Sequence, residues 1–173
     1  MGFSLYAATV PSYIQLLEAV TSLLGKAEAF CGEQGIAPAD IVQARLAADM
    51  LPFAYQVKSA RVHSLGAIEG VRKGVFSPDL SQPAGDFAGL KAGIGEAIAA
   101  LQEIDVGEVD AFVGRDMRFE FGDRRMEYTA ENFLLSFSQP NFYFHATTAY
   151  DILRSKGVPL GKRDFLGKVR VKR

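Results

Sequence analysis

The chain of 173 residues carries 19 Lys and Arg against 20 Asp and Glu, a net charge of −1, and 49% of its residues are hydrophobic. This composition is that of a single globular domain with a sizeable core, and it excludes global disorder. A near-neutral chain has no overall charge to attract nucleic acid or an anionic membrane, so both are disfavoured as partners. We therefore expect residues 1–173 to form one domain.

The cysteine count and the N-terminal residues bear on the cellular compartment in which the protein is expected. Cys31 is the single cysteine, so no intrachain disulfide can form and the fold needs no oxidising compartment. The N-terminus lacks a basic segment followed by an apolar run, which argues against a signal peptide. Because no stretch approaches the roughly 18 to 20 apolar residues of a membrane span, we expect a cytoplasmic protein.

Apolar residues recur at intervals of three and four in four long segments, the pattern of amphipathic helices. The predicted helices cover about 9–30, 52–74, 86–104 and 129–156, with a short helical piece at 38–47 and a loop at 75–85. Asp49 is placed to cap the second helix, whose first turn Pro52 suits. Pro140 lies inside the fourth helix and is expected to kink it.

Residues 116–128 change to a period of two, which indicates a β-hairpin. Gly122-Asp123 suits a two-residue type II′ turn, and this turn sets the register of the strands. The resulting pairs, Phe121–Arg124, Glu120–Arg125, Phe119–Met126, Arg118–Glu127 and Met117–Tyr128, match charge with opposite charge and apolar with apolar. The predicted fold is all-α, a four-helix bundle with one small hairpin between helices three and four.

The fourth helix places polar residues among aromatic ones. At 100° per residue, Asn141, Thr148 and Asp151 share the predicted core face with Phe144, and His145 lies on its edge. The opposite face is apolar as well: Phe142, Tyr143, Ala146, Ala149, Tyr150 and Leu153. A helix that is apolar all round is covered on both sides. The hairpin, the C-terminal segment or a second copy of the chain would cover it, and a homodimer is one expectation.

The second helix has a matching stripe. Gln56 and His63 are seven residues apart and share one flank, and Asp49 extends the stripe if the helix reaches that far. If this flank faces helix four, His63, Gln56 and His145 would line one cavity. Asn141 and Thr148 would complete it, and bundles commonly build their sites in such a place.

Structural roles compete with this hypothesis. His63 can be satisfied by a backbone carbonyl, and Asp49 is more readily a helix cap than a catalytic acid. Asn141 can bond carbonyls freed by the Pro140 kink, and Thr148 can bond back within its own helix.

The tail from about Lys162 is basic, with Lys162, Arg163, Lys168, Arg170, Lys172 and Arg173 against Asp164. One interpretation is an arm that binds anions or nucleic acid, and the other is a solvated terminus. We favour the solvated terminus, since Phe165 is the one aromatic residue in the tail.

Long runs of the C-terminal half carry a family resemblance. They are PNFYFHATTAYDILR at 140–154 and GVPLGKRDFLG at 157–167, joined by SLY at 4–6, Val10-Pro11 and ARLAADM at 44–50. Over nearly its whole length the chain resembles an uncharacterised, domain-of-unknown-function branch of the DinB/YfiT-like superfamily. The resemblance implies a DinB-like four-helix bundle that is often dimeric.

The resemblance also implies a metal site. Members of the superfamily bind a divalent metal through one histidine of helix two and a His-x-x-x-His pair of helix four. His63 matches the first ligand and His145 one of the pair, but Ala149 stands where the other histidine is expected. With two histidines in the chain, a three-histidine site cannot form in one subunit. A mixed site for Zn²⁺ or Ni²⁺ would need Asp49, Asp151 or water beside His63 and His145.

Two functional hypotheses follow. In the first, the chain is a small-molecule enzyme whose inter-helix pocket uses His63 and His145 as base or partial metal ligands. In the second, it is a non-catalytic ligand-binding or dimeric structural protein that has lost the metal site. Nucleic-acid binding through the tail is the weakest alternative.

Overall fold

The computed structural model describes residues 4–172, so residues 1–3 and Arg173 of the basic tail lie outside it. The helices are α1 (Leu5–Gln34), α2 (Pro38–Val42), α3 (Phe53–Arg61), α4 (Ala67–Lys73), α5 (Phe87–Gln102), α6 (Val106–Asp110), α7 (Ala130–Asn132), α8 (Gln139–Ser155) and α9 (Lys162–Leu166). The strands are β1 (Val75–Phe76), β2 (Asp116–Phe121) and β3 (Arg124–Thr129). Two π-helical turns, η1 (Val62–Gly66) and η2 (Phe133–Ser138), join α3 to α4 and α7 to α8.

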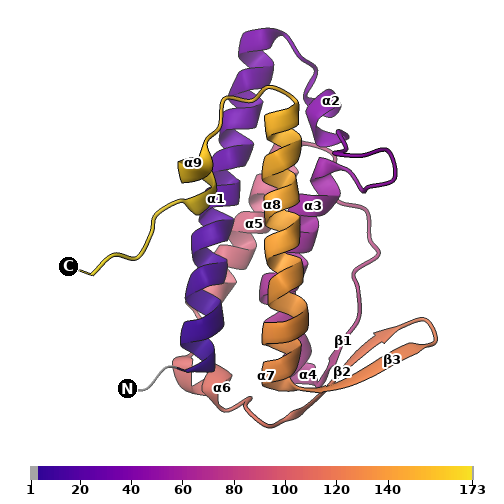
Figure 1. The fold of residues 1–173 in the computed structure, drawn as a ribbon, viewed down its shortest axis with the longest axis vertical. Coiled ribbons are helices and arrows are strands. Elements are labelled where there is room, and N and C mark those ends of the chain that lie inside the picture. The colour runs from indigo at the N-terminus through magenta and orange to yellow at the C-terminus, as the bar shows by residue number, and fades with distance from the viewer. Residues whose placement is uncertain (1–3, 173) are drawn as a thin grey trace.

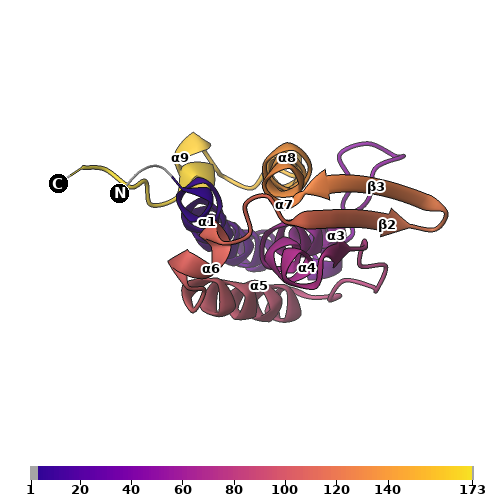
Figure 2. The ribbon, with the colours of Figure 1, turned by 90° about the horizontal axis from the view of Figure 1, so that it is seen from below.

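The long helices form the predicted bundle. In Figure 1, α1 and α8 run upward, whereas α3–η1–α4 and α5 run downward. Both α1 and α3 pack against α5 and against α8, so the helices close a ring around one core. A view along the bundle shows this ring with the hairpin projecting from it (Figure 2). The predicted all-α bundle with a hairpin between helices three and four is confirmed.

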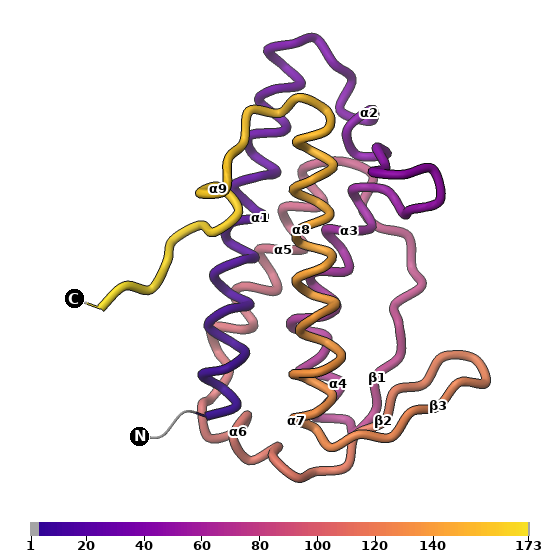
Figure 3. Tube along the Cα trace, in the orientation of Figure 1, coloured from indigo at the N-terminus to yellow at the C-terminus, as the bar shows by residue number. Residues whose placement is uncertain are grey.

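Residues 77–86, which we call the strap, make the parallel order of α4 and α5 possible. The strap leaves β1 at the lower end of the bundle and climbs beside α3 to the start of α5 (Figure 3). None of the helices in residues 4–172 is both long and apolar enough to cross a lipid bilayer.

The hairpin has the predicted register. Phe121 pairs with Arg124, Glu120 with Arg125, and Phe119 with Met126. Gly122 has φ +56° whereas Asp123 has no positive φ, as a type II′ turn requires. The prediction of a plain loop at 75–85 was incomplete, because Val75 and Phe76 pair in parallel with β2. Two residues are too few to show a strand period.

Beyond Phe137 the predicted core face of helix four is wrong for Asn141, Phe144 and Asp151, whereas Thr148 is buried as predicted. Phe144 is 54% exposed, and Asn141 and Asp151 are only half-buried. The buried residues of this stretch are Ser138, Phe142, Ala146, Thr148, Ala149, Ile152 and Leu153. A π-turn inserts an extra residue into the helix, so η2 rotates every later position by roughly 100° relative to an unbroken α-helix. Pro140 follows η2 in the first turn of α8, where its missing N–H is tolerated.

The second apolar face of α8 is covered within the chain except at Tyr143, which is 39% exposed. The Tyr13 ring of α1 packs edge-on against Phe142, with ring centroids 4.9 Å apart. Tyr150 packs against Phe165 of α9 at 5.8 Å. Of the alternatives given by the sequence, the C-terminal segment covers Tyr150, whereas α1, which was not among those alternatives, covers Phe142.

The predicted cap of the second helix is also wrong. The helix begins at Phe53 with Pro52 at the N-cap position, and no side chain caps it. Asp49 lies exposed in the preceding turn. Because Pro52 disfavours helical backbone at Leu51, the helix begins after the proline, and Asp49 lies three residues before the N-cap position.

Gly70 of α4 provides a test of the packing between α4 and β1. A Cβ at this position would lie 3.0 Å from Phe76 Cβ and 3.3 Å from the Val75 carbonyl oxygen. We expect Gly70→Ala to lower the free energy of unfolding by about 1–3 kcal/mol, measured by urea titration. Gly95→Ala is the control, since a Cβ there meets nothing within 4 Å and helix propensity should raise stability by up to about 1 kcal/mol. Equal effects of the two changes would contradict the packing.

Candidate functional site

The structure brings the two histidines together. His63 projects from η1 and His145 from α8, and their rings stack with centroids 5.7 Å apart and planes 15° from parallel. The sequence left open whether the flank of helix two that carries His63 faces helix four, and in the structure the two histidines meet. Both side chains are half-buried.

His145 is oriented by Gln56. The His145 Nδ1 atom lies 2.7 Å from Gln56 Oε1, and Gln56 Nε2 donates to the Leu51 carbonyl at 2.8 Å. Because a carbonyl oxygen can only accept, the Leu51 contact fixes which end of the amide faces the imidazole. Gln56 Oε1 is therefore an acceptor, and His145 Nδ1 must carry the proton.

His63 is oriented by Ser138, the last residue of η2. The Ser138 hydroxyl donates to the His63 carbonyl oxygen at 3.0 Å, and its oxygen lies 3.2 Å from His63 Nδ1. A hydroxyl has one hydrogen, so Ser138 Oγ must accept from His63 Nδ1. Both imidazoles are thus Nδ1–H tautomers. In the described part of the chain neither Nε2 atom has a hydrogen-bond partner.

Aromatic rings surround the pair. Phe76 and Phe137 lie 5.4 and 6.0 Å from the His63 ring, measured between centroids. Tyr55 and Phe144 lie 6.3 and 5.2 Å from the His145 ring. Because Phe76 belongs to β1, the small sheet contributes directly to the walls of the site.

Both histidines are neutral at physiological pH. Burial lowers the pKa of His63 to about 4, with a further contribution from the neighbouring His145. Burial also lowers the pKa of His145 to about 4. A proton on either ring would be poorly solvated, and it would repel a proton on the other.

Of the other predicted site residues, one lies in the site and the others do not. Gln56 belongs to the site, but the Asn141 amide donates to the Phe137 carbonyl at 2.8 Å, which is the structural role considered from the sequence. Thr148 is buried further along α8, and Asp151 is six residues beyond His145, about 9 Å along the helix axis. Ser138 was missed, because its position at the end of a π-turn cannot be read from an α-helical period.

The residues present do not complete a metal site. Within residues 4–172 no three His, Cys, Asp or Glu side chains come together closely enough to hold a metal ion. Asp49 and Asp151 therefore do not supply the third ligand that a mixed site would need. Ala149, at the position of the missing family histidine, is buried in the core of the bundle.

The bundle, with α1 and α8 parallel and a hairpin before the last long helix, has the fold of a DinB-like protein. A solved structure of the same fold is that of a DinB family member protein from Shewanella denitrificans, with a TM-score of 0.81 and 26% sequence identity. The match covers 98% of this chain and 95% of that chain. No curated protein matches the chain significantly.

The family model for the domain of unknown function DUF1993 matches residues 5–166. The chain therefore belongs to the DUF1993 family, a branch of the DinB-like superfamily, as the resemblance implied.

The histidine pair should make stability depend on pH. Since folding lowers both pKa values from 6.5 to about 4, the unfolded chain binds protons more readily, and stability is complete above pH 7 and falls as pH drops from 6.5 towards 4. We expect a loss of up to about 2 kcal/mol per histidine between pH 7 and pH 5, measured by urea unfolding. The double variant His63→Gln and His145→Gln should flatten this profile. An unchanged profile would show that the pKa values are not lowered.

Proposed function

We propose that the chain binds a small aromatic or apolar molecule that donates hydrogen bonds to the neutral histidine pair. The observation that carries this proposal is the pair of fixed tautomers: Gln56 and Ser138 hold both Nδ1–H groups and leave both Nε2 lone pairs without a partner in residues 4–172. A lone pair on a half-buried imidazole with aromatic neighbours recognises an O–H or N–H group on an apolar body.

The low pKa values favour binding over catalysis. A general base is most effective when its pKa lies near the working pH, and a pKa of about 4 makes each imidazole a good hydrogen-bond acceptor but a weak proton acceptor at pH 7. General-base catalysis by His145 is the second candidate, favoured by the Gln56 contact that would stabilise a transient imidazolium through Nδ1–H. It would require a substrate that raises the pKa of His145 on binding.

Phenol and anisole test the binding proposal, since they share an aromatic ring and only phenol donates a hydrogen bond. We expect phenol to shift the His63 and His145 side-chain resonances in nitrogen-edited NMR spectra, and anisole to bind at least tenfold more weakly. His145→Ala should abolish the phenol response. Equal binding of the two probes would contradict the proposal.

The tautomers themselves can be read in the same spectra. We expect the hydrogen on Nδ1 in both histidines, with Ser138→Ala altering the state of His63 and leaving that of His145 unchanged. Hydrogen on Nε2 of either ring in the wild-type chain would remove the acceptor on which the proposal rests.

Elemental analysis of untagged protein separates this proposal from a metal-dependent function. We expect no stoichiometric metal after incubation with Zn²⁺ or Ni²⁺, because within residues 4–172 the donor set offers two histidines and no third ligand. Stoichiometric metal that is lost in both His63→Ala and His145→Ala would overturn the metal-free site.

We also propose that the outer face of α8 and η2 is a homodimer contact. Leu135 of η2 and Tyr143 and Phe144 of α8 are 41%, 39% and 54% exposed, and large apolar residues exposed along one helix are candidates for an interaction surface. Light scattering should give twice the chain mass of 18.8 kDa, and the double change Leu135→Asp and Tyr143→Asp should halve it. Val113→Asp, at a 57% exposed apolar position elsewhere, is the control and should leave the mass unchanged.

A further inference from the structure

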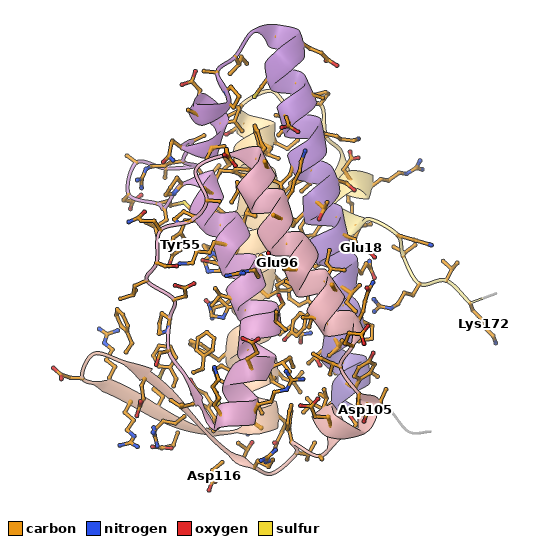
Figure 4. The ribbon with its side chains drawn as sticks, turned by 180° about the vertical axis from the view of Figure 1, so that it is seen from behind. Glu18, Tyr55, Glu96, Asp105, Asp116 and Lys172 are labelled. Carbon is orange, nitrogen blue, oxygen red and sulfur yellow. The ribbon has the colours of Figure 1, made fainter. Side chains whose placement is uncertain are left out.

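A cavity of about 200 Å³ lies between α3, α5 and the strap, and neither His63 nor His145 lines it. Val57, Leu90 and Ile94 form its apolar wall, and the strap borders it with Ser81 and Pro83. A volume of this size is enough for a small organic molecule, since a cavity of about 150 Å³ can hold a benzene ring. Tyr55 of α3 and Glu96 of α5 mark the bordering helices in Figure 4.

The strap is fixed over this cavity at two points. Lys58, whose side chain is only 7% exposed, donates to the carbonyls of Asp79 and Ser81 at 2.8 and 2.5 Å and lies 3.0 Å from Asp79 Oδ1. At Gly89 a Cβ would lie 2.7 Å from Ala84 Cβ, so the strap approaches α5 closely where there is no side chain. The walls of the cavity are therefore built by specific contacts.

Arg61 gives the cavity its charge. Both charged residues of the lining are cations, but Asp79 and the two strap carbonyls already satisfy the Lys58 ammonium. Arg61 has one ion-pair partner among the described residues, Glu96, at 4.0 Å with 76% of the Glu96 side chain exposed. At that distance and exposure the pair contributes little, so the guanidinium can exchange Glu96 for another carboxylate.

Gly93 positions the Arg61 side chain. A Cβ at Gly93 would lie 4.0 Å from Arg61 Cδ and Nη1, so the arginine side chain passes directly over the α5 backbone at this glycine. The five N–H donors of a guanidinium match a carboxylate in a two-point geometry. An anion held there would have its apolar part against Val57, Leu90 and Ile94.

We propose that this cavity binds a small monocarboxylate with an apolar body, its carboxylate on Arg61 and its hydrocarbon part between α3 and α5. The site is separate from the histidine pair, because it lies between α3 and α5 whereas the pair lies between η1 and α8. Its occupancy is independent of the function proposed for the pair.

Hexanoate tests the assignment, with hexanamide as the uncharged analogue and acetate as the carboxylate without an apolar body. Titrated into nitrogen-15-labelled protein at pH 7, hexanoate should give saturable shifts of the Ser81, Gly89 and Gly93 amides. Hexanamide and acetate should each bind at least tenfold more weakly, since one lacks the charge and the other the hydrocarbon chain.

Variants complete the test. Arg61→Gln should weaken hexanoate binding at least tenfold, and Arg61→Lys should weaken it by less. Arg124→Gln at the hairpin turn is the control and should have no effect. Thermal melts would show that each variant is folded. Unaltered affinity in Arg61→Gln, equal affinity for hexanamide, or shifts confined to residues around His63 and His145 would each overturn the assignment.

Discussion

The contact between His63 and His145 depends on hydrogen bonds made behind the rings. A continuous series runs from the Leu51 carbonyl through the Gln56 amide to His145, across the stacked rings to His63, and on to Ser138. It joins the turn before α3, the η1 turn, and the junction of η2 with α8. Both Nδ1 atoms have a hydrogen-bond partner, which offsets much of the energetic cost of burying the two rings. The hydrogen-bonding capacity that remains is at the two Nε2 atoms.

Both π-helical turns serve this contact. His63 lies within η1, and Ser138, which orients it, is the last residue of η2. A π-turn widens the helix and leaves backbone groups with poorer geometry, and such turns are often found at functional sites. Here η2 also changes the direction in which the following residues point, and for this reason His145 faces His63 while Phe144 is exposed to solvent.

Sequence reasoning predicted the architecture well because it depends on features that are local. The hairpin register follows from a turn dipeptide and complementary pairs, and the helices follow from a period that most of each segment obeys. The same period predicted that Gln56 and His63 share a flank, and both residues reach the site. It failed where the period itself changes: η2 displaced Asn141, Phe144 and Asp151 from the predicted core face and hid the role of Ser138. The strap cavity was not predicted, because it depends on a long-range contact from Lys58 to carbonyls 21 and 23 residues away.

The η2 turn has a consequence for how the chain tolerates changes in length. Removing one residue from η2 would allow this segment to become an ordinary α-helix. The lost residue and the lost π-turn would cancel, so the side chains of α8 would keep their directions. Removing one residue between Pro140 and His145 would meet no π-turn that could absorb the change, so Ala146 would leave the core and His145 would point away from His63. The spacing from Pro140 to His145 is therefore part of the site. Among members of the family, chains that differ in length within this interval would be expected to differ in their chemistry as well.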